Sequence, residues 1–287
     1  MKQKLRGIII CIVLMFVIFP VPAHADTGPK PSVQVDFTDM ENELYYVTLL
    51  SQSDSTGPAT AYDGNNQYAC YQEGDEGYEI WKKFVDYQDS DGYYFLQWFE
   101  QCSGNDTYLW SYYPPSPFKV LVYFPERDTF AVSEVCERYA FDSYFTARLD
   151  ASESGTLVVS KTYHFKWEMI SLAARIAITI LIELVIALFF GFRTKKQLCF
   201  LAVVNILTQT ALNILLNILN YNRGPYAFTF YYVVFELLIF AVEAVLYRKF
   251  LSGKKEKPAR PVLYALTANV LSFASGLWLA HIIPGIF

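Results

Sequence analysis

The chain has 287 residues, 53% of them hydrophobic and 18% charged, and its charges are unevenly divided. Residues 26–165 hold 23 acidic and 8 basic residues, a formal charge of −15, whereas residues 166–287 hold 5 acidic and 12 basic residues, a charge of +7. This division predicts an acidic, water-exposed domain followed by a membrane domain, and it excludes a soluble cytosolic enzyme and a disordered protein. The net charge of −5 also argues against a nucleic-acid binder, because such proteins carry an excess of basic residues for phosphate contacts.

The first 25 residues predict a secretory signal peptide. Three basic residues among the first six precede an apolar stretch, Ile8–Phe19, that is too short for a typical membrane span. Ala23-His24-Ala25 matches the small-x-small cleavage rule, so we expect the mature chain to begin at Asp26.

Residues 26–150 predict one compact, mainly-β extracytoplasmic domain, sandwich-like and with a helical insertion. Segments rich in Val, Tyr, Phe and Thr between turn-forming residues predict strands at Val33–Phe37, Tyr45–Leu50, Tyr93–Phe99, Phe118–Phe124, Thr129–Val132 and Ala140–Leu149. Glu79–Tyr87 has apolar residues at helical intervals and predicts the inserted helix. Residues 151–166 predict a polar linker.

Cys70, Cys102 and Cys136 lie in this exported domain, where disulfides persist. One disulfide and one free thiol are expected, with all three pairings open, and three unpaired cysteines are the alternative. Asp86–Gly92 resembles part of a calcium loop but lacks both terminal carboxylate ligands, so a hairpin turn at Asp91-Gly92 is expected instead.

Four later segments are long enough to cross a bilayer, which makes the fold class an α+β membrane protein with a four-helix bundle. They cover residues 167–192, 198–219, 226–247 and 262–283. The loops 192–197 and 248–260 carry nine basic residues, whereas the loop 220–225 carries one. The positive-inside rule therefore predicts a multi-pass cell-membrane protein with residues 26–166 outside and both basic loops in the cytoplasm.

Polar side chains inside these spans are the candidate ligand- or ion-binding residues, because they are costly in hydrocarbon. Counting from the span ends predicts two layers. The outer layer contains Arg175, which could pair with Glu236, and Asn213. On the second span, Asn205, Thr208, Gln209 and Asn213 form one polar stripe. The inner layer contains Glu183, Asn205, Glu243 and Asn269. Three glutamates and one arginine cannot all be charged and neutralised, so a protonated glutamate or a bound cation is expected.

The two pairs of the inner layer also predict a parallel duplication. Glu183 is followed 22 residues later by Asn205, and Glu243 is followed 26 residues later by Asn269, each in a hairpin with a basic turn. Two readings of these residues stay open: hydrogen bonds that hold the bundle together, or a transport, proton or ligand site.

Enzyme chemistry is not expected. No Asp follows Asp150, and the sequence has no HExxH, CxxC or GxSxG motif and no phosphate-binding glycine loop. His281 is six residues from Ser275 on the same predicted helix, on a different face, and cannot serve as its base. We expect neither a cofactor nor a metal centre.

The chain resembles an uncharacterised group of bacterial membrane proteins. The resemblance is carried by the Glu/Asn hairpins and by four stretches: Gly28-Pro29-Lys30-Pro31-Ser32, Tyr45-Tyr46-Val47-Thr48-Leu49-Leu50, Phe118–Pro125 and Tyr139-Ala140-Phe141-Asp142-Ser143-Tyr144. It implies a signal peptide, an extracytoplasmic domain and four transmembrane helices, and it implies no activity.

Two functional hypotheses follow. The first is a non-enzymatic membrane protein whose acidic, Tyr-rich extracytoplasmic domain binds a cell-surface or membrane partner; 16 of the 22 tyrosines lie in residues 26–165, although most of them are expected in the core. The second is a small cation- or proton-linked transporter or permease-like subunit that uses the intramembrane Glu and Asn residues. Its four helices form a thin wall, which favours a homodimer in the lipid bilayer.

Overall fold

The computed structural model describes residues 28–40, 42–65, 68–150, 155–163, 165–251 and 259–282. The predicted signal peptide, residues 151–154 of the predicted linker and residues 252–258 of the second basic loop lie outside these ranges. The helices and strands are β1 (Ser32–Phe37), β2 (Leu44–Ser51), β3 (Ser55–Thr56), β4 (Ala59–Thr60), α2 (Tyr78–Asp86), β5 (Tyr94–Phe95), β6 (Glu100–Ser103), β7 (Thr107–Trp110), β8 (Phe118–Phe124), β9 (Thr129–Ser133), β10 (Asp142–Leu149), β11 (Thr156–Lys161), α3 (Phe165–Phe189), α4 (Lys195–Arg223), α5 (Pro225–Phe250) and α6 (Ala259–Ile282).

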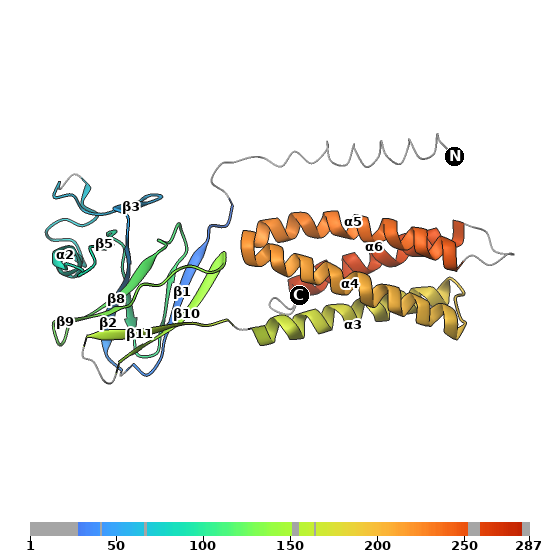
Figure 1. Cartoon of the computed structure of the whole chain (residues 1–287), viewed down its shortest axis with the longest axis horizontal. Helices are drawn as coiled ribbons and strands as arrows, with labels where there is room; N and C mark the ends of the chain where they lie inside the picture. The colour runs from blue at the N-terminus through green and yellow to red at the C-terminus, as the bar shows by residue number, and fades with distance from the viewer. Residues whose placement is uncertain are drawn as a thin grey trace.

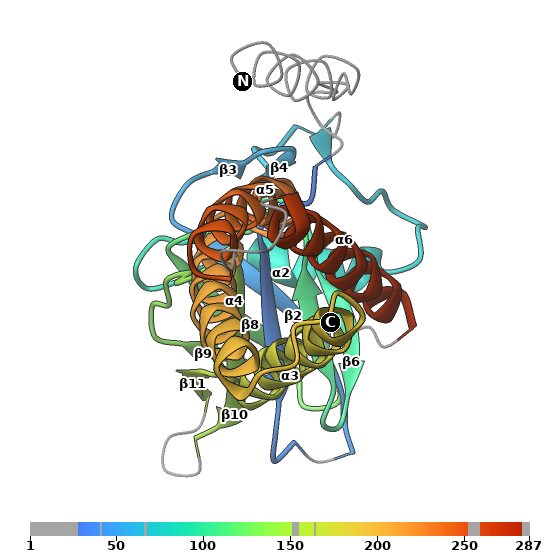
Figure 2. The ribbon, with the colours of Figure 1, turned by 90° about the vertical axis from the view of Figure 1, so that its right-hand side faces the viewer.

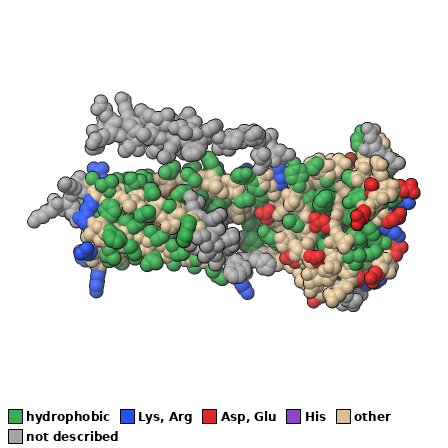
Figure 3. Space-filling model, turned by 180° about the vertical axis from the view of Figure 1, so that it is seen from behind, with side chains coloured by type: hydrophobic (Ala, Val, Ile, Leu, Met, Phe, Trp, Pro, Cys, Tyr) green, Lys and Arg blue, Asp and Glu red, His purple; other side chains and the backbone are tan. Residues whose placement is uncertain are grey.

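The molecule is elongated, with a β domain at one end and a helical bundle at the other (Figure 1). In the space-filling view, acidic side chains gather on the β domain and hydrophobic side chains cover the bundle (Figure 3). Lysine and arginine side chains gather at the end of the bundle farthest from the β domain (Figure 3). The uneven charge distribution of the sequence therefore follows the long axis of the molecule.

The β domain is built on a single nine-stranded sheet that curls into a half-barrel. The strand order is β5-β2-β8-β9-β11-β10-β1-β7, and β6 also pairs with β2. The pairs β1–β10 and β9–β11 are parallel, and the other pairs are antiparallel. Because β6 and β7 follow each other in the sequence but pair near opposite ends of the sheet, the short turn between them draws those two ends together.

Alternate residues of the strands fill the inside of the half-barrel, as the pleat requires. On β1, Val33, Val35 and Phe37 are buried while their neighbours are partly exposed. Strand β8 is buried on both faces, because its outer face is covered by α2. Phe84 of α2 stacks on Phe95, with ring centroids 5.1 Å apart, and packs edge-on against Tyr123 of β8. This double burial explains the almost unbroken apolar sequence of β8.

The turn after α2 binds a lysine of β8. The Lys119 Nζ lies 2.9 Å from Asp89 Oδ1 and 2.5 Å from Asp91 Oδ2, and the side chains of Lys119 and Asp89 are 4% and 1% exposed. Gly92 N donates to Asp89 O at 3.1 Å. The segment is therefore a turn, as expected, but it joins α2 to β5 rather than closing a hairpin, and Lys119 forms ion pairs with two of its carboxylates, Asp89 and Asp91.

The predicted sandwich is wrong, because the strands form one continuous curled sheet. The parallel β1–β10 pair joins what would otherwise be two separate sheets. The predicted strand Tyr93–Phe99 is also interrupted: Gln97 has φ 60°, and its side chain binds Thr60 O, Tyr68 O and Cys70 N. In addition, β11 occupies much of the predicted linker and pairs with both β10 and β9.

The cysteines of the described chain are all free, so the predicted disulfide is not formed. Cys102 is 3% exposed and packs inside the half-barrel, whereas Cys70 is exposed on the surface. Cys136 is partly buried, and its Sγ is 3.6 Å from Glu134 O.

The bundle is antiparallel, and each helix contacts two neighbours: α3 contacts α4 and α6, and α5 contacts the same two (Figure 2). Three of its helical segments are long and apolar enough to cross a membrane: Met169–Phe189, Lys195–Arg223 and Pro225–Phe250. In the described residues, the predicted fourth span, α6, is not among them. The chain is thus an α+β protein with a membrane-type helical domain.

The β domain contacts the bundle at the turn between α4 and α5. Phe141 N donates to Tyr221 O at 2.8 Å, and the Tyr221 ring packs against Tyr139 and Tyr163 at centroid distances of 6.3 and 5.9 Å. The predicted loop 220–225 is reduced to Gly224, which has φ 80° and ψ −177°. A Cβ at this glycine would lie 2.5 Å from the Phe141 ring. We call this end of the bundle the outer end.

Candidate site in the bundle interior

The polar residues predicted inside the spans face one another along the axis of the bundle. Buried polar side chains come from all four helices: Glu183 from α3, Asn205, Gln209 and Asn213 from α4, Glu243 from α5 and Asn269 from α6. They form two groups, which we name the outer cavity and the inner cluster.

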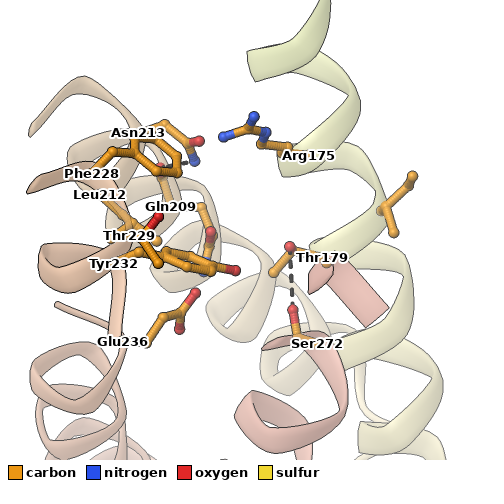
Figure 4. Close-up of a pocket in the computed structure, with 12 residues that line it drawn as sticks. Arg175, Thr179, Gln209, Leu212, Asn213, Phe228, Thr229, Tyr232, Glu236 and Ser272 are labelled. Atoms are coloured by element: carbon orange, nitrogen blue, oxygen red, sulfur yellow. Dashed lines mark hydrogen bonds between the residues drawn. The ribbon is translucent and has the colours of Figure 1, made fainter. Parts of the chain in front are cut away.

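The outer cavity has a volume of about 250 Å³ and lies in the half of the bundle nearer the β domain. Figure 4 shows its labelled side chains converging from α3, α4, α5 and α6. The lining residues are Arg175, Ile178, Thr179, Gln209, Leu212, Asn213, Phe228, Thr229, Tyr232, Glu236, Ser272 and Gly276.

The charged residues of the outer cavity do not form the ion pair that the sequence suggested. Among the described residues no salt bridge joins Arg175 to Glu236. The Arg175 guanidinium points toward Asn213 and lies 5.8 Å from the centroid of the Phe228 ring, whereas Glu236 lies below Tyr232 (Figure 4). An arginine and a glutamate therefore line the same cavity without forming an ion pair with each other.

The inner cluster lies farther from the β domain and is centred on Glu243, which is fully buried. Thr208 Oγ1 donates to Glu243 Oε1 at 2.9 Å, and Asn269 Nδ2 donates to Glu243 Oε2 at 2.7 Å. Each oxygen of the Glu243 carboxylate thus accepts a hydrogen bond. These bonds offset the cost of burying the carboxylate, which would otherwise be several kcal/mol.

Glu183 and Asn205 belong to the same cluster but are not satisfied in this way. Glu183 is 0% exposed, and neither of its carboxylate oxygens has a hydrogen-bond partner among the described residues. Asn205 Nδ2 donates to Leu201 O at 3.1 Å and to Tyr247 Oη at 3.3 Å, while its Oδ1 is buried without a partner. The two predicted Glu/Asn pairs therefore differ: the α5–α6 pair is bonded, and the α3–α4 pair is not.

Three of the buried asparagines donate a hydrogen bond to the backbone of their own helix. Asn205, Asn213 and Asn269 each donate from Nδ2 to the carbonyl four residues earlier, at 3.1, 2.8 and 2.9 Å. This back-bonding satisfies an amide donor without a neighbouring helix. The spacing of Asn205, Gln209 and Asn213, four residues apart, keeps all three on the interior face of α4.

Two buried tyrosines close the inner cluster on the side away from the β domain, and sequence reasoning did not single them out. Tyr247 and Tyr264 are both 0% exposed, with ring centroids 5.5 Å apart, and Tyr264 Oη donates to Glu183 O at 3.2 Å. Tyr247 lies one helical turn after Glu243, and Tyr232 lies one turn before Glu236. The four-residue spacing from a glutamate is the sequence signal that could have identified Tyr247 and Tyr232.

Among the described residues no group of three His, Cys, Asp or Glu could hold a metal ion.

No protein-family model matches the chain, and no curated protein sequence matches it. Among solved structures, a proposed cell adhesion protein from Bacteroides ovatus matches with a TM-score of 0.24 and 9% sequence identity. The match covers 47% of this chain and 44% of that protein, less than half of either. A likeness at this level carries no statement about the fold or the function of this chain.

Proposed function

We propose that this protein is a non-enzymatic integral membrane protein of permease type, which binds a small solute with both a positive and a negative group in its outer cavity. The observation that carries the proposal is the presence of Arg175 and Glu236 in one cavity without an ion pair between them. Opposite charges that do not neutralise each other can each pair with a ligand.

The proposed topology has four spans, with the β domain outside the cell and the basic loops in the cytoplasm. Support for α6 as the fourth span comes from its outward-facing apolar side chains, since Leu263, Val270 and Trp278 are 54%, 56% and 64% exposed. A helix with such a surface and a buried asparagine on its other face suits a position between lipid and the bundle interior. The nine basic residues of the predicted cytoplasmic loops set the orientation.

The size and chemistry of the outer cavity limit the solute. Its volume of about 250 Å³ is below the roughly 300–1,000 Å³ of sites for drug-sized ligands. The amides of Gln209 and Asn213 offer further hydrogen bonds, and Phe228 and Tyr232 offer aromatic faces to a cationic group. A small zwitterion fits this set better than a purely apolar or singly charged molecule.

The test is equilibrium binding to the purified full chain with three radiolabelled probes: glycine betaine as the zwitterion, choline as the cation and propionate as the anion. We expect glycine betaine to bind best. Arg175→Gln and Glu236→Gln should each weaken its binding about tenfold or more, because a hydrogen bond to a charged group is worth about 1.5–3 kcal/mol. Arg223→Gln, which changes an exposed arginine outside the cavity lining, is the matched control and should bind normally.

Equal binding of glycine betaine to wild type and Arg175→Gln would contradict the proposal, as would the absence of binding by all three probes. Preferential binding of choline that survives Arg175→Gln but not Glu236→Gln would replace the zwitterion with a simple cation.

A second candidate function is binding of a surface partner by the β domain. It is favoured by three exposed aromatic side chains, Tyr68, Tyr94 and Trp98, which are 60%, 47% and 49% exposed. The backbone of Tyr68 is bonded to the Gln97 side chain, so the segments around these residues are joined. The neighbouring segment also carries exposed Glu73, Asp75 and Glu76.

An aromatic surface beside carboxylates suits a cationic peptide. The detached fragment 26–163 should unfold cooperatively and bind an octalysine peptide, and the double variant Tyr68→Ala/Trp98→Ala should bind it about tenfold more weakly. An unfolded fragment, or undiminished binding by the double variant, would remove this candidate.

A further inference from the structure

Three buried oxygen atoms of the inner cluster have no hydrogen-bond donor in the described chain: Glu183 Oε1, Glu183 Oε2 and Asn205 Oδ1. Glu183 is 0% and Asn205 1% exposed, so bulk water does not reach them. All three atoms are acceptors when the carboxyl group is ionised. A buried group of this kind is costly unless a positive charge or a donor is present.

The orientation of the Asn205 amide follows from its partners. Leu201 O, at 3.1 Å, can only accept a hydrogen bond, so the nitrogen of the amide must face it. The same nitrogen donates to Tyr247 Oη, which uses its second hydrogen. Oδ1 is therefore directed away from these partners and is left free to bind a cation.

No cationic side chain is available to Glu183 among the described residues. The groups that interact with it are Asn205 from α4, Glu243 and Glu236 from α5, and Tyr264 from α6. None of them donates a hydrogen bond of acceptable geometry to its carboxylate oxygens, and two of them are carboxyl groups that add negative charge.

Arg193, ten residues after Glu183, is exposed beyond the end of α3. Two further arginines of the bundle also lie elsewhere. Arg175 lies eight residues earlier on α3 and lines the outer cavity. Arg260 lies at the opposite end of the bundle, where its Nε donates to Phe190 O at 2.7 Å. The positive charge that would neutralise Glu183 is thus supplied by none of these arginines.

We propose that Glu183 and Asn205 bind a sodium ion in the interior of the bundle. A proton on Glu183 would provide one donor and would leave one of the three oxygens without a partner, whereas a hard monovalent cation can be coordinated by all three. One cation also neutralises the one carboxylate that lacks hydrogen bonds. A divalent ion would leave one positive charge uncompensated beside Glu183, because the other carboxylate of the cluster, Glu243, already accepts bonds from Thr208 and Asn269.

This inference rests on the membrane placement of the bundle in the proposed function but not on solute binding in the outer cavity. The ion would occupy a separate site, deeper in the bundle, and its binding can be measured without any solute. Failure of the probe-binding assay and failure of the sodium assay are therefore distinguishable.

The first experiment measures the Tm of the purified full chain in detergent at pH 7.5, in NaCl or in choline chloride at the same ionic strength. Because an ion that binds the folded state raises its stability, we expect a Tm about 3 °C or more higher in NaCl. Glu183→Gln should abolish the sodium response while its Tm in choline chloride is no lower than that of wild type, since the uncompensated charge is gone. Asn205→Leu should weaken the response, and Glu126→Gln, an exposed glutamate of the β8–β9 turn, should retain it.

A second experiment uses the unmodified protein, so that it does not depend on the folding of a variant. Dicyclohexylcarbodiimide modifies protonated carboxyl groups in membrane domains, and mass spectrometry locates the modified residue. A bound sodium ion should protect Glu183 at constant pH, and choline should not.

Sodium-dependent stability that is lost in Glu183→Gln, together with sodium protection of Glu183 in the unmodified protein, supports the proposal. A Tm and a rate of Glu183 modification that respond to pH but not to sodium would overturn it in favour of a glutamic acid that is neutralised by a proton. A sodium response that persists in Glu183→Gln would place the ion elsewhere and would also overturn it.

Discussion

At the residue scale, the β domain depends on one buried ion pair. Lys119 lies on the outer face of β8, and Asp89, its partner, is 1% exposed. Burial alone would lower the pKa of Lys119, but the hydrogen bonds to Asp91 and Asp89 outweigh it, so the pKa is raised. The stabilising contribution of this lysine is thus complete below its unfolded pKa of 10.5 and is lost only as the pH rises through the higher folded pKa.

We predict that Lys119→Met destabilises the β domain by about 3–5 kcal/mol, because it leaves the Asp89 carboxylate buried without a cation. The double variant Lys119→Met/Asp89→Asn should recover much of this loss. Urea denaturation of the full chain in detergent, followed by tryptophan fluorescence, measures both. A loss below about 1 kcal/mol in the single variant would mean that the pair is hydrated.

The cysteines give a second prediction at this scale. Burial, together with the nearby carboxylates of Asp106 and Glu100, raises the pKa of Cys102 to about 12. The thiolate of Cys102 at neutral pH is then about a thousandfold scarcer than for a thiol of pKa 9. Exposed Cys70 should react with a maleimide in the folded protein, and Cys102 only after unfolding. If unfolding without a reductant releases no additional thiol, a disulfide is present after all.

How far residue patterns predicted the site can be seen from Asn205 and Tyr247. The four-residue spacing along α4 identified Asn205, Gln209 and Asn213 as one stripe, because helical periodicity alone decides which side chains share a face. Tyr247 was not identified, although it lies four residues after Glu243, because an aromatic residue in an apolar span usually reflects core packing. Its role became visible when its hydroxyl was seen to accept from Asn205. Bonded and unbonded glutamates also look the same in a sequence.

At the scale of elements, local signals located most helices and strands but not their ends. Strands β1, β2 and β8 were predicted because alternation and apolar runs are strong signals. Strand β11 was assigned to a linker, because it is only six residues long and is bounded by polar sequence. Nothing in such a segment indicates that it pairs with strands on both sides. Helix α4 begins three residues earlier than predicted because Thr194 and Gln197 form a capping box, a signal present in the sequence.

The turn between α4 and α5 depends on Gly224 for two separate reasons. Its φ of 80° and ψ of −177° lie in a region that is almost exclusive to glycine, and a Cβ would meet the Phe141 ring. Gly64, with φ +89° and nothing within 4 Å of an added Cβ, offers a control for backbone strain alone.

We predict that Gly224→Ala lowers stability by more than the roughly 1–3 kcal/mol of backbone strain, because steric overlap with Phe141 is added. Gly64→Ala should show strain only. Adding Phe141→Ala to Gly224→Ala should remove the steric part. Measuring the Tm of wild type and of these three variants tests this. Equal losses for the two glycine variants would show that the β domain does not pack on this turn.

At the scale of the whole molecule, the charge distribution and the docking contact belong to one arrangement. Composition alone indicated an acidic domain and an apolar one, because the distribution of charged residues along the chain can be counted without knowledge of the fold. The contact of Tyr221 with Tyr139 and Tyr163 could not be predicted, since it joins residues more than 50 positions apart in the sequence. That contact places the outer cavity close beneath the β domain.

The central claim is that the acidic β domain and the basic end of the bundle lie on opposite sides of a membrane. The most direct test replaces the five native cysteines and introduces one new cysteine at a time, as Glu76→Cys or Lys196→Cys, both at exposed positions. A membrane-impermeant maleimide added to intact cells should label only the first variant, and permeabilised cells should label both. Labelling of both variants in intact cells, or of Lys196→Cys alone, would contradict the account.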